Sequence, residues 1–226
     1  MTQKPLNKLK VTRPPKTLRQ LAYDKLREAI FNSTFEPGER LIERDLCDQL
    51  EVSRTVVREV LRQLEAEGLV ETIANQGPIV AILNSDKVKE IYEIRALLEV
   101  VAAKACIANG TLEQIDLLSQ IVDQIDAAFE EGDSAGVLSQ TNRFYEQFFA
   151  IARKPFAWEM VQSLNARINR LRVMTISSPD RHEEAIGEMR KIILAIRARD
   201  AQAAEQACLE HIQAVATIAG KLLTAT

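Results

Sequence analysis

The sequence predicts a mainly α-helical protein in two parts, of which only the first contains β-structure. Apolar residues recur at three- and four-residue spacing along most of the chain, as they do in amphipathic helices. One pair of short β-prone runs, residues 69–72 and 79–82, flanks the polar turn 74–78 and indicates a hairpin. Beyond Ser85 no further strand signal occurs, so we expect an all-α bundle there.

Two closely spaced helices are expected ahead of the hairpin, over residues 43–50 and from Arg54 onward. Ser53 is a favoured N-cap residue, because its hydroxyl can accept one of the backbone N–H groups left free at a helix start. The second helix then buries one stripe of apolar side chains: Val57, Val60, Leu61 and Leu64. Its remaining surface carries basic and hydroxyl groups: Arg54, Thr55, Arg58 and Arg62. Two helices joined this tightly are typical of a helix-turn-helix.

A helix-turn-helix followed by a hairpin forms a winged domain. In this arrangement the first residues of the second helix meet base edges in the major groove of DNA. Arg54, Thr55 and Arg58 occupy these positions, and arginine can hold guanine through two hydrogen bonds. The alternative is an ordinary small α+β domain whose basic helix face is only solvated.

Residues 21–70 closely resemble the N-terminal domain of GntR-family transcription regulators. The resemblance rests on Pro37-Gly38, on Leu41 and Glu43, and on the segment SRTVVREVLRQLEAEGLV. It implies binding to double-stranded operator DNA, with the tip of the wing approaching the minor groove. The DNA-binding residues that it implies are Arg44, Ser53, Arg54, Thr55, Arg58, Gln76 and Gly77.

Length and composition are those of a soluble intracellular protein with two cores. The chain has 226 residues, 46% of them hydrophobic and 27% charged, and its formal net charge is −3. No stretch approaches a membrane-spanning length, and the first 18 residues lack the apolar core of a signal peptide. We therefore expect a cytoplasmic protein without a membrane partner. Three cysteines, Cys47, Cys106 and Cys208, lack the paired spacing of a zinc site or a disulfide framework, so we expect them to be buried.

Positive charge is concentrated at the N-terminus. Residues 1–27 hold eight Lys or Arg against the single acidic residue Asp24. We expect residues 1–15 to form a basic flexible leader, which either adds phosphate contacts or only improves solubility. The expected domains follow: a winged helix-turn-helix DNA-binding domain at 16–82, a linker at 83–85, and a helical effector-binding and dimerisation domain at 86–226.

Cap residues divide the helical domain into about six helices. Thr111 and Gln114 have the spacing of a capping box, in which each side chain accepts the other residue's backbone N–H. The predicted helix starts are Ser85, Thr111, Asp133, Pro155, Ser178-Pro179 and Asp200. Because the joints between these helices are short, we expect an antiparallel bundle.

Arg95 is an unusual residue for the first helix of this bundle. It falls within a predicted buried stripe made by Ile91, Ile94, Leu98, Val101, Ala102 and Ala105. A buried arginine requires an anion. Glu99 lies one turn further on and could supply that anion internally. A bound carboxylate ligand could also supply it, with Glu99 then orienting Arg95.

Other helices also bring polar or sulfur-bearing groups toward the interior. Thr141 and Tyr145 lie on or beside the expected buried face of one helix, which includes Leu138. Met189 and His211 lie on the expected buried faces of two later helices. Each of these side chains can be an ordinary core residue with a satisfied polar group. If they converge, they form a pocket of mixed polarity that suits a small ligand.

The helical domain resembles the FCD effector domain of the FadR subgroup. The segments EIYEIRALLEVVAAKAC and IILAIRARDAQAAEQACLEHIQ carry this resemblance. It implies an Asp-x-x-Phe-His motif and two later histidines that hold a divalent metal, to which an organic acid binds. In this chain Thr141 replaces the aspartate of the motif and Tyr145 the first histidine. Met189 replaces the second histidine, and only His211 keeps its ligand type.

Neutral threonine, tyrosine and methionine side chains do not supply the charge and nitrogen donors that such a cation needs. We therefore expect no divalent metal and no other cofactor, and a ligand that is bound directly by the protein. The candidate effector-binding residues are Arg95, Thr141, Asn142, Tyr145, Asn165, Asn169, Met189 and His211. His182 is either a displaced metal ligand or a solvent-exposed residue.

Catalysis is not expected of this chain. It has no Gly-rich phosphate loop, no nucleophile elbow and only two histidines, neither with a carboxylate at a predictable spacing. The residues and the two resemblances together predict a homodimeric repressor that binds a roughly palindromic operator and responds to a small organic acid. The alternative is an architectural DNA-binding dimer without a small-molecule effector.

Overall fold

The computed structural model describes residues 16–176, 178 and 181–224. The chain divides into two compact units. One unit takes in the chain up to Ala66 together with Val70–Val80, and the other takes in Glu67–Leu69 and the chain from Ala81. The basic leader predicted at residues 1–15 lies outside the described residues.

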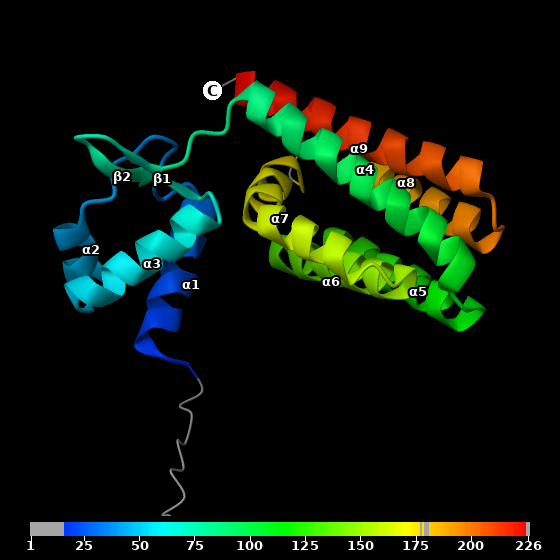
Figure 1. Cartoon of the computed structure of the whole chain (residues 1–226), viewed down its shortest axis with the longest axis horizontal. Coiled ribbons are helices and arrows are strands. Elements are labelled where there is room, and N and C mark those ends of the chain that lie inside the picture. Colours follow the sequence, from blue (N-terminus) through cyan, green and yellow to red (C-terminus); the bar gives the residue numbers. More distant parts are fainter. Residues whose placement is uncertain (1–15, 177, 179–180, 225–226) are drawn as a thin grey trace, which may run out of the picture. The chain divides into compact units, whose positions relative to one another are not determined.

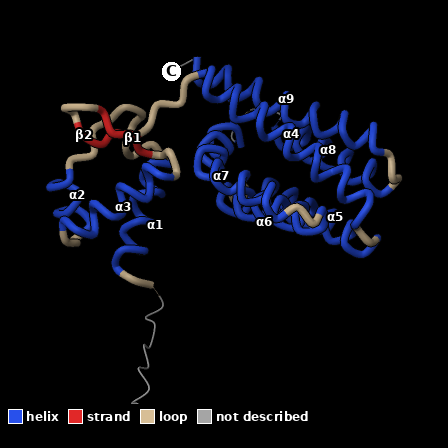
Figure 2. Tube along the Cα trace, in the orientation of Figure 1, coloured by secondary structure: helices blue, strands red, loops and turns tan. Residues whose placement is uncertain are grey.

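The described part of the first unit contains three helices and one antiparallel hairpin, whose strands are red in Figure 2. The elements are α1 (Leu18–Phe31), α2 (Glu43–Leu50), α3 (Arg54–Ala66), β1 (Val70–Ile73) and β2 (Gly77–Val80). Both α1 and α2 pack against α3. The core between them is made of branched apolar side chains: Leu26, Ile30, Leu46, Val60 and Leu64. The predicted starts of α2 and α3 are confirmed.

The hairpin differs from its prediction in the bounds of both strands. The register pairs Val70 with Val80 and Ile73 with Gly77, so both strands extend toward the turn, which is shorter than expected. Gly77 has φ +86° and begins β2 directly after the turn, because glycine tolerates this backbone conformation. Pro78 was predicted to lie in the turn but pairs opposite Thr72, a position that proline tolerates in short edge strands.

The regular elements in the described part of the second unit are all helices, drawn blue in Figure 2 and joined by loops. Its helices are α4 (Ser85–Asn109), α5 (Leu112–Glu130), α6 (Ser134–Ala152), α7 (Pro155–Ile176), α8 (Arg181–Arg197) and α9 (Ala201–Thr224). None of the helices in the described residues is both long and apolar enough to cross a membrane.

Within this unit α4 runs beside α9, and α5 packs against both α6 and α8 (Figure 1). Helix α6 supplies an aromatic centre through Phe144, Phe148 and Phe149, all about 1% exposed. The Phe149 ring stacks on Trp158 of α7, with 5.5 Å between ring centroids. The predicted fold class, a winged helix-turn-helix followed by an antiparallel all-α bundle, is confirmed.

Most of the predicted caps are formed. The Thr111 hydroxyl accepts the backbone N–H of Gln114, and the Gln114 side chain accepts that of Thr111, which completes the capping box. The cap predicted at Ser85 is wrong, because Asn84 accepts the N–H of Lys87 at 2.9 Å and α4 begins at Ser85 itself. The start predicted at Ser178-Pro179 lies partly outside the described residues, and α8 is described from Arg181.

The predicted buried face of α4 is wrong in part. Ile94 and Val101 are exposed. The residues that α4 buries include Val88, Tyr92, Glu99, Ala103 and Cys106. The reason is that α4 packs on α6, α7, α8 and α9, so its buried surface is wider than one apolar stripe. On α6, Val137 is buried and the predicted Leu138 is half-buried.

Two of the three cysteines are buried as expected. Cys106 and Cys208 lie in the core of the helical unit, and burial raises the pKa of the Cys106 thiol to about 12. Cys47 on α2 is half-buried, contrary to the prediction. The two core thiols are therefore kept protonated and unreactive at neutral pH.

Candidate functional site

The start of α3 presents the residues predicted to read DNA. The Ser53 hydroxyl accepts the backbone N–H of Val56 at 3.4 Å, and this contact caps the helix. Because Val57, Val60 and Leu64 point into the core, the opposite face of the helix is free of packing. Arg54 and Arg58 are exposed on that face.

Glu43 at the start of α2 forms ion pairs with both Arg54 and Arg58. Its carboxylate accepts a hydrogen bond from Arg54 Nε at 2.9 Å and from Arg58 Nε at 2.9 Å. The hydrogen bond from Arg58 lowers the pKa of the Glu43 carboxyl, with that from Arg54 acting in the same direction. Arginine has five N–H donors, so engagement through Nε leaves the end of each guanidinium for another acceptor. Sequence reasoning gave Glu43 no such role.

The remaining predicted DNA-contact residues are also on the surface. Thr55 is exposed beside Arg54, and Arg44 is exposed on α2, where it donates to Asp45 at 3.1 Å. In the wing, Gln76 is exposed at the turn and Gly77 begins the returning strand. The first unit therefore displays basic and polar groups on the helix start and on the wing.

The helical unit contains a small cavity with a volume of about 50 Å³. Residues from all six helices, α4 to α9, line it. Five of the predicted effector residues line it: Arg95, Thr141, Tyr145, Met189 and His211. Asn142 and Asn169 do not line it but contact Arg172, which does. Asn165 neither lines the cavity nor contacts Arg172, so this predicted residue is not brought to the site.

Arg95 and Glu99 form a buried ion pair beside the cavity. Arg95 Nε donates to Glu99 Oε1 at 2.5 Å, and the side chains are 4% and 1% exposed. The Arg95 guanidinium also lies over the Tyr145 ring, 4.7 Å from its centroid. Glu99 thus supplies the anion that Arg95 requires. The structure favours the internal pairing among the sequence alternatives, and Arg95 remains a wall residue of the cavity.

A second buried network surrounds His211. Its Nδ1 lies 2.7 Å from Glu188 Oε2, and Arg181 donates to both oxygens of the same carboxylate at 3.1 and 2.9 Å. Its Nε2 lies 3.1 Å from the Tyr145 hydroxyl. Burial lowers the pKa of the His211 imidazole, against the opposing effect of the hydrogen bond to Glu188. His211 is therefore a neutral ring in a satisfied network.

The residues at the family's metal position do not fit a divalent cation. The Thr141 hydroxyl donates to the carbonyl of Val137 at 2.6 Å, and the ring nitrogens of His211 are engaged by Tyr145 and Glu188. Met189 offers only a soft thioether sulfur. Across the part of the chain that the structure describes, no cluster of three His, Cys, Asp or Glu side chains could hold a metal ion.

His182 lies at the surface of its helix, which agrees with the solvent-exposed alternative, but it also has partners. The ring is partly exposed, lies 2.6 Å from Asp126 and stacks on Phe129 with 4.8 Å between centroids. It is a partnered residue at the surface of α8.

Arg172 is, with Arg181, a charged cavity residue that sequence reasoning missed. Arg172 Nη1 donates to Asn142 Oδ1 at 2.9 Å and to Asn169 Oδ1 at 2.7 Å. Its guanidinium lies 5.5 Å from the Tyr145 ring centroid. Burial lowers the pKa of Arg172 to about 10, and the positive charge of Arg95 acts in the same direction. The only sequence signal was its spacing of three residues from Asn169.

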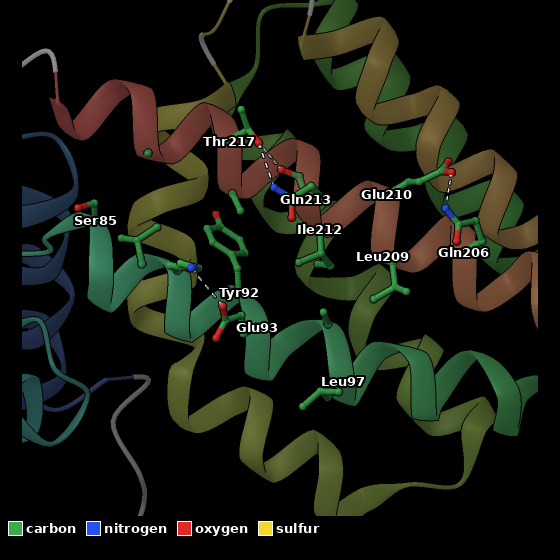
Figure 3. Close-up of a pocket in the computed structure, with 15 residues that line it drawn as sticks. Ser85, Tyr92, Glu93, Leu97, Gln206, Leu209, Glu210, Ile212, Gln213 and Thr217 are labelled. Atoms are coloured by element: carbon green, nitrogen blue, oxygen red, sulfur yellow. Dashed lines mark hydrogen bonds and ion pairs between the residues drawn. The ribbon is translucent and has the colours of Figure 1, made fainter.

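A larger, open groove of about 880 Å³ runs along α4 and α9. Figure 3 shows Tyr92 and Leu97 entering it from α4, and Leu209 and Ile212 entering it from α9. Its walls are mainly apolar, with the Lys89–Glu93 pair at one edge. The groove differs from the cavity in being a wide, open surface feature rather than a small space among the helices.

Together these features define a class of protein. A winged helix-turn-helix with arginines at the start of its second helix is a DNA-binding unit, and a helical unit with a polar cavity is typical of a regulator. The chain belongs to the GntR family of bacterial regulatory proteins: the gntR family model matches residues 18–80, and the FCD domain model matches residues 90–214. It is a DNA-binding transcriptional regulator with an FCD domain.

Two bacterial regulators match most of this chain and most of their own length. The uncharacterized regulator YdhC of Bacillus subtilis is 28% identical over 190 residues, which are 84% of this chain and 85% of that protein. The transcriptional repressor RspR of Escherichia coli is 26% identical over 202 residues, 89% of each chain. These relatives are transcriptional regulators by name.

Solved structures have the same fold. McbR/YncC of Escherichia coli superposes with a TM-score of 0.73 at 23% identity, over 91% of this chain and 98% of that one. A putative GntR regulator from Rhodococcus sp. RHA1 gives a TM-score of 0.70 at 25% identity, over 92% and 98%. At this level of identity the likeness supports the fold and not a particular ligand.

Proposed function

We propose that this protein is a cytoplasmic repressor, without enzymatic activity, whose affinity for operator DNA is controlled by a small organic acid. The observation that carries the DNA-binding part is the pair Arg54 and Arg58, both held by Glu43 at the start of α3. The similarity to RspR, a repressor by name, favours repression over activation. Residues 16–82 would bind DNA, and residues 86–226 would bind the effector and dimerise.

The cavity of the helical unit supports control by a ligand. Three arginines lie at its wall, namely Arg95, Arg172 and Arg181, together with the hydroxyl groups of Thr141 and Tyr145. Such a wall suits an anion better than a neutral or cationic molecule. Ligand binding alters DNA affinity only if the ligand binds one of two poses of the DNA-binding units more tightly than the other.

The test begins with selection of a DNA sequence from random duplexes by the full-length protein. The enriched duplex is then titrated by fluorescence anisotropy, with and without a panel of organic acids. We expect one sequence with two-fold symmetry to be enriched and one acid to weaken its binding. If a sequence is enriched but no acid changes its affinity, the protein is an architectural DNA-binding dimer and the effector role fails.

Dimerisation is expected to use the α4–α9 groove. Leu97 of α4 and Leu209 of α9 are exposed and line this groove, and Ile94 and Val101 extend the exposed apolar face of α4 at helical spacing from Leu97. A two-fold dimer can cover this face with a second copy of itself and then presents two α3 helices to a palindromic site.

Leu97→Glu should therefore convert the protein from dimer to monomer, because it places a charge in a face that the dimer would bury. Leu97 is 69% exposed in the single chain, so the fold of the monomer should be unaffected. Leu112→Glu is the matched control, since Leu112 is 59% exposed at the start of α5 and lies outside the groove. Light scattering gives the mass of each variant. Equal masses for wild type and Leu97→Glu would remove this face from the interface.

A further inference from the structure

The charges around the cavity do not balance. Arg95 is paired with Glu99, and Arg181 is paired with Glu188. Arg172 donates to two neutral amide oxygens, and no carboxylate among the described residues forms an ion pair with it. Three positive groups therefore face two negative ones.

The other titratable groups at the wall do not restore the balance. Burial raises the pKa of both Tyr92 and Tyr145, so these phenols stay protonated at neutral pH. Burial also lowers the pKa of His211, so its ring stays neutral. The wall carries one uncompensated positive charge, and it belongs to Arg172. Arg172 is partly buried, and a cation that is shielded from water without a counter-charge is stabilised when an anion joins it.

The amide next to Arg172 is also incompletely satisfied. Asn169 is fully buried and its Oδ1 accepts from Arg172. Its Nδ2 has no hydrogen-bond partner among the described residues. Asn169 does not line the cavity, so this unpaired donor shows only that Arg172 stands in an incompletely paired polar environment.

Cavity size limits the anion that fits. A water molecule occupies roughly 10 to 15 Å³ on this measure, so about 50 Å³ corresponds to a ligand of about three to five non-hydrogen atoms. The apolar side chains of Ile125, Val137 and Val215 complete the lining. The space therefore suits one charged head and a short apolar tail.

We propose that Arg172 binds the carboxylate of a small monocarboxylic acid directly, without a metal ion, in the cavity of the helical unit. This inference rests on the proposed function and names its ligand class. Arg172 replaces the cation that the family motif would supply, because Thr141, Tyr145 and Met189 cannot hold one. One carboxylate neutralises the excess charge, whereas a di- or tricarboxylate brings surplus negative charge into a space too small for it.

The test uses full-length protein in chelator-treated buffer, with acetate and propionate as monoanionic probes and succinate and citrate as larger polyanions. Calorimetry gives the dissociation constant, and thermal unfolding gives the stability of the unliganded protein. We expect acetate or propionate to bind the wild type and to bind Arg172→Met roughly tenfold to hundredfold more weakly, as for a lost charge-assisted hydrogen bond. Arg143→Met is the matched control, since Arg143 is exposed on α6 and should bind the probes like wild type.

A second readout separates ligand binding from a structural role. Arg172→Met removes a partly buried charge but also takes the donor from the buried Asn169 Oδ1, so the melting temperature of the unliganded variant should change little. A lower melting temperature together with undiminished binding of the monoanions would make Arg172 a structural residue and overturn the proposal. So would binding that appears only after Zn²⁺ or Mn²⁺ is added, or no binding of either monoanion.

Failure of this inference can be told from failure of the proposed function. If citrate or succinate alone binds and weakens DNA binding, the ligand class is wrong and effector control stands. If propionate binds through Arg172 but the affinity for the selected duplex is unchanged, the site is confirmed and effector control fails.

Discussion

Glu99→Ala should lower the free energy of unfolding of the helical unit by about 3 to 5 kcal/mol, because it leaves the Arg95 guanidinium buried without its anion. The two side chains are almost wholly buried and are 2.5 Å apart. Arg172 stands nearby, so the variant would hold two uncompensated cations at one cavity. Urea unfolding followed by the fluorescence of Trp158 measures this unit by itself, since Trp158 is the one tryptophan of the chain and lies on α7.

Two controls separate the buried pair from ordinary charge removal. Asp123→Ala breaks an exposed contact with Arg190 in the same unit and should cost less than about 1 kcal/mol. The double variant Arg95→Met, Glu99→Leu removes both charges and keeps the volume, so it should recover most of the lost stability. If Glu99→Ala unfolds at the same urea concentration as Asp123→Ala, the pair does not stabilise the fold in this way.

The same pair changes how an Arg95 variant must be interpreted. Arg95→Ala would leave the Glu99 carboxylate buried and alone, so it should destabilise the unit by a similar amount. A lost ligand response in that variant would therefore not assign Arg95 to the ligand. Arg172 can be replaced without leaving a buried carboxylate unpaired, which makes it the better probe of the cavity.

Local signals in the sequence were sufficient for most of the fold. The capping box of Thr111 and Gln114 and the cap at Ser53 depend on residues only three apart, and both form as the sequence predicts. The buried face of α4 could not be obtained in this way. Ile94 is exposed and Glu99 is buried because the neighbours of α4 come from four other helices, which hydropathy along one helix does not describe.

The residues of the cavity were also only partly predictable from patterns within single helices. Arg95, Tyr145 and His211 could be predicted because each interrupts an apolar stripe in its own helix. Arg172 lies in the segment Arg167–Arg172, which contains three arginines and resembles a solvated face. Its place at the cavity wall depends on the packing of α7, and its partner Asn142 comes from α6, 30 residues away. A pattern within one helix therefore could not predict the contact between Arg172 and Asn142.

Arg58→Ala should weaken binding to the selected duplex about 5- to 150-fold and relax base preference at one position of each half-site. Arg58 Nε is held by Glu43, so the outer end of its guanidinium is oriented for two hydrogen bonds to one base. Binding to random DNA should change much less. Arg143→Ala is the control for charge, because Arg143 is exposed on α6 of the helical unit.

Glu43→Ala gives a sharper test of the same geometry, since two effects oppose each other there. Removing a carboxylate from a DNA-facing surface should strengthen binding to random duplexes through phosphate attraction. Removing the acceptor that orients Arg54 and Arg58 should weaken binding to the selected duplex. We therefore expect the ratio of specific to random affinity to fall in anisotropy titrations at matched salt. If both affinities rise equally, Glu43 only repels DNA, and the arginines need no positioning residue.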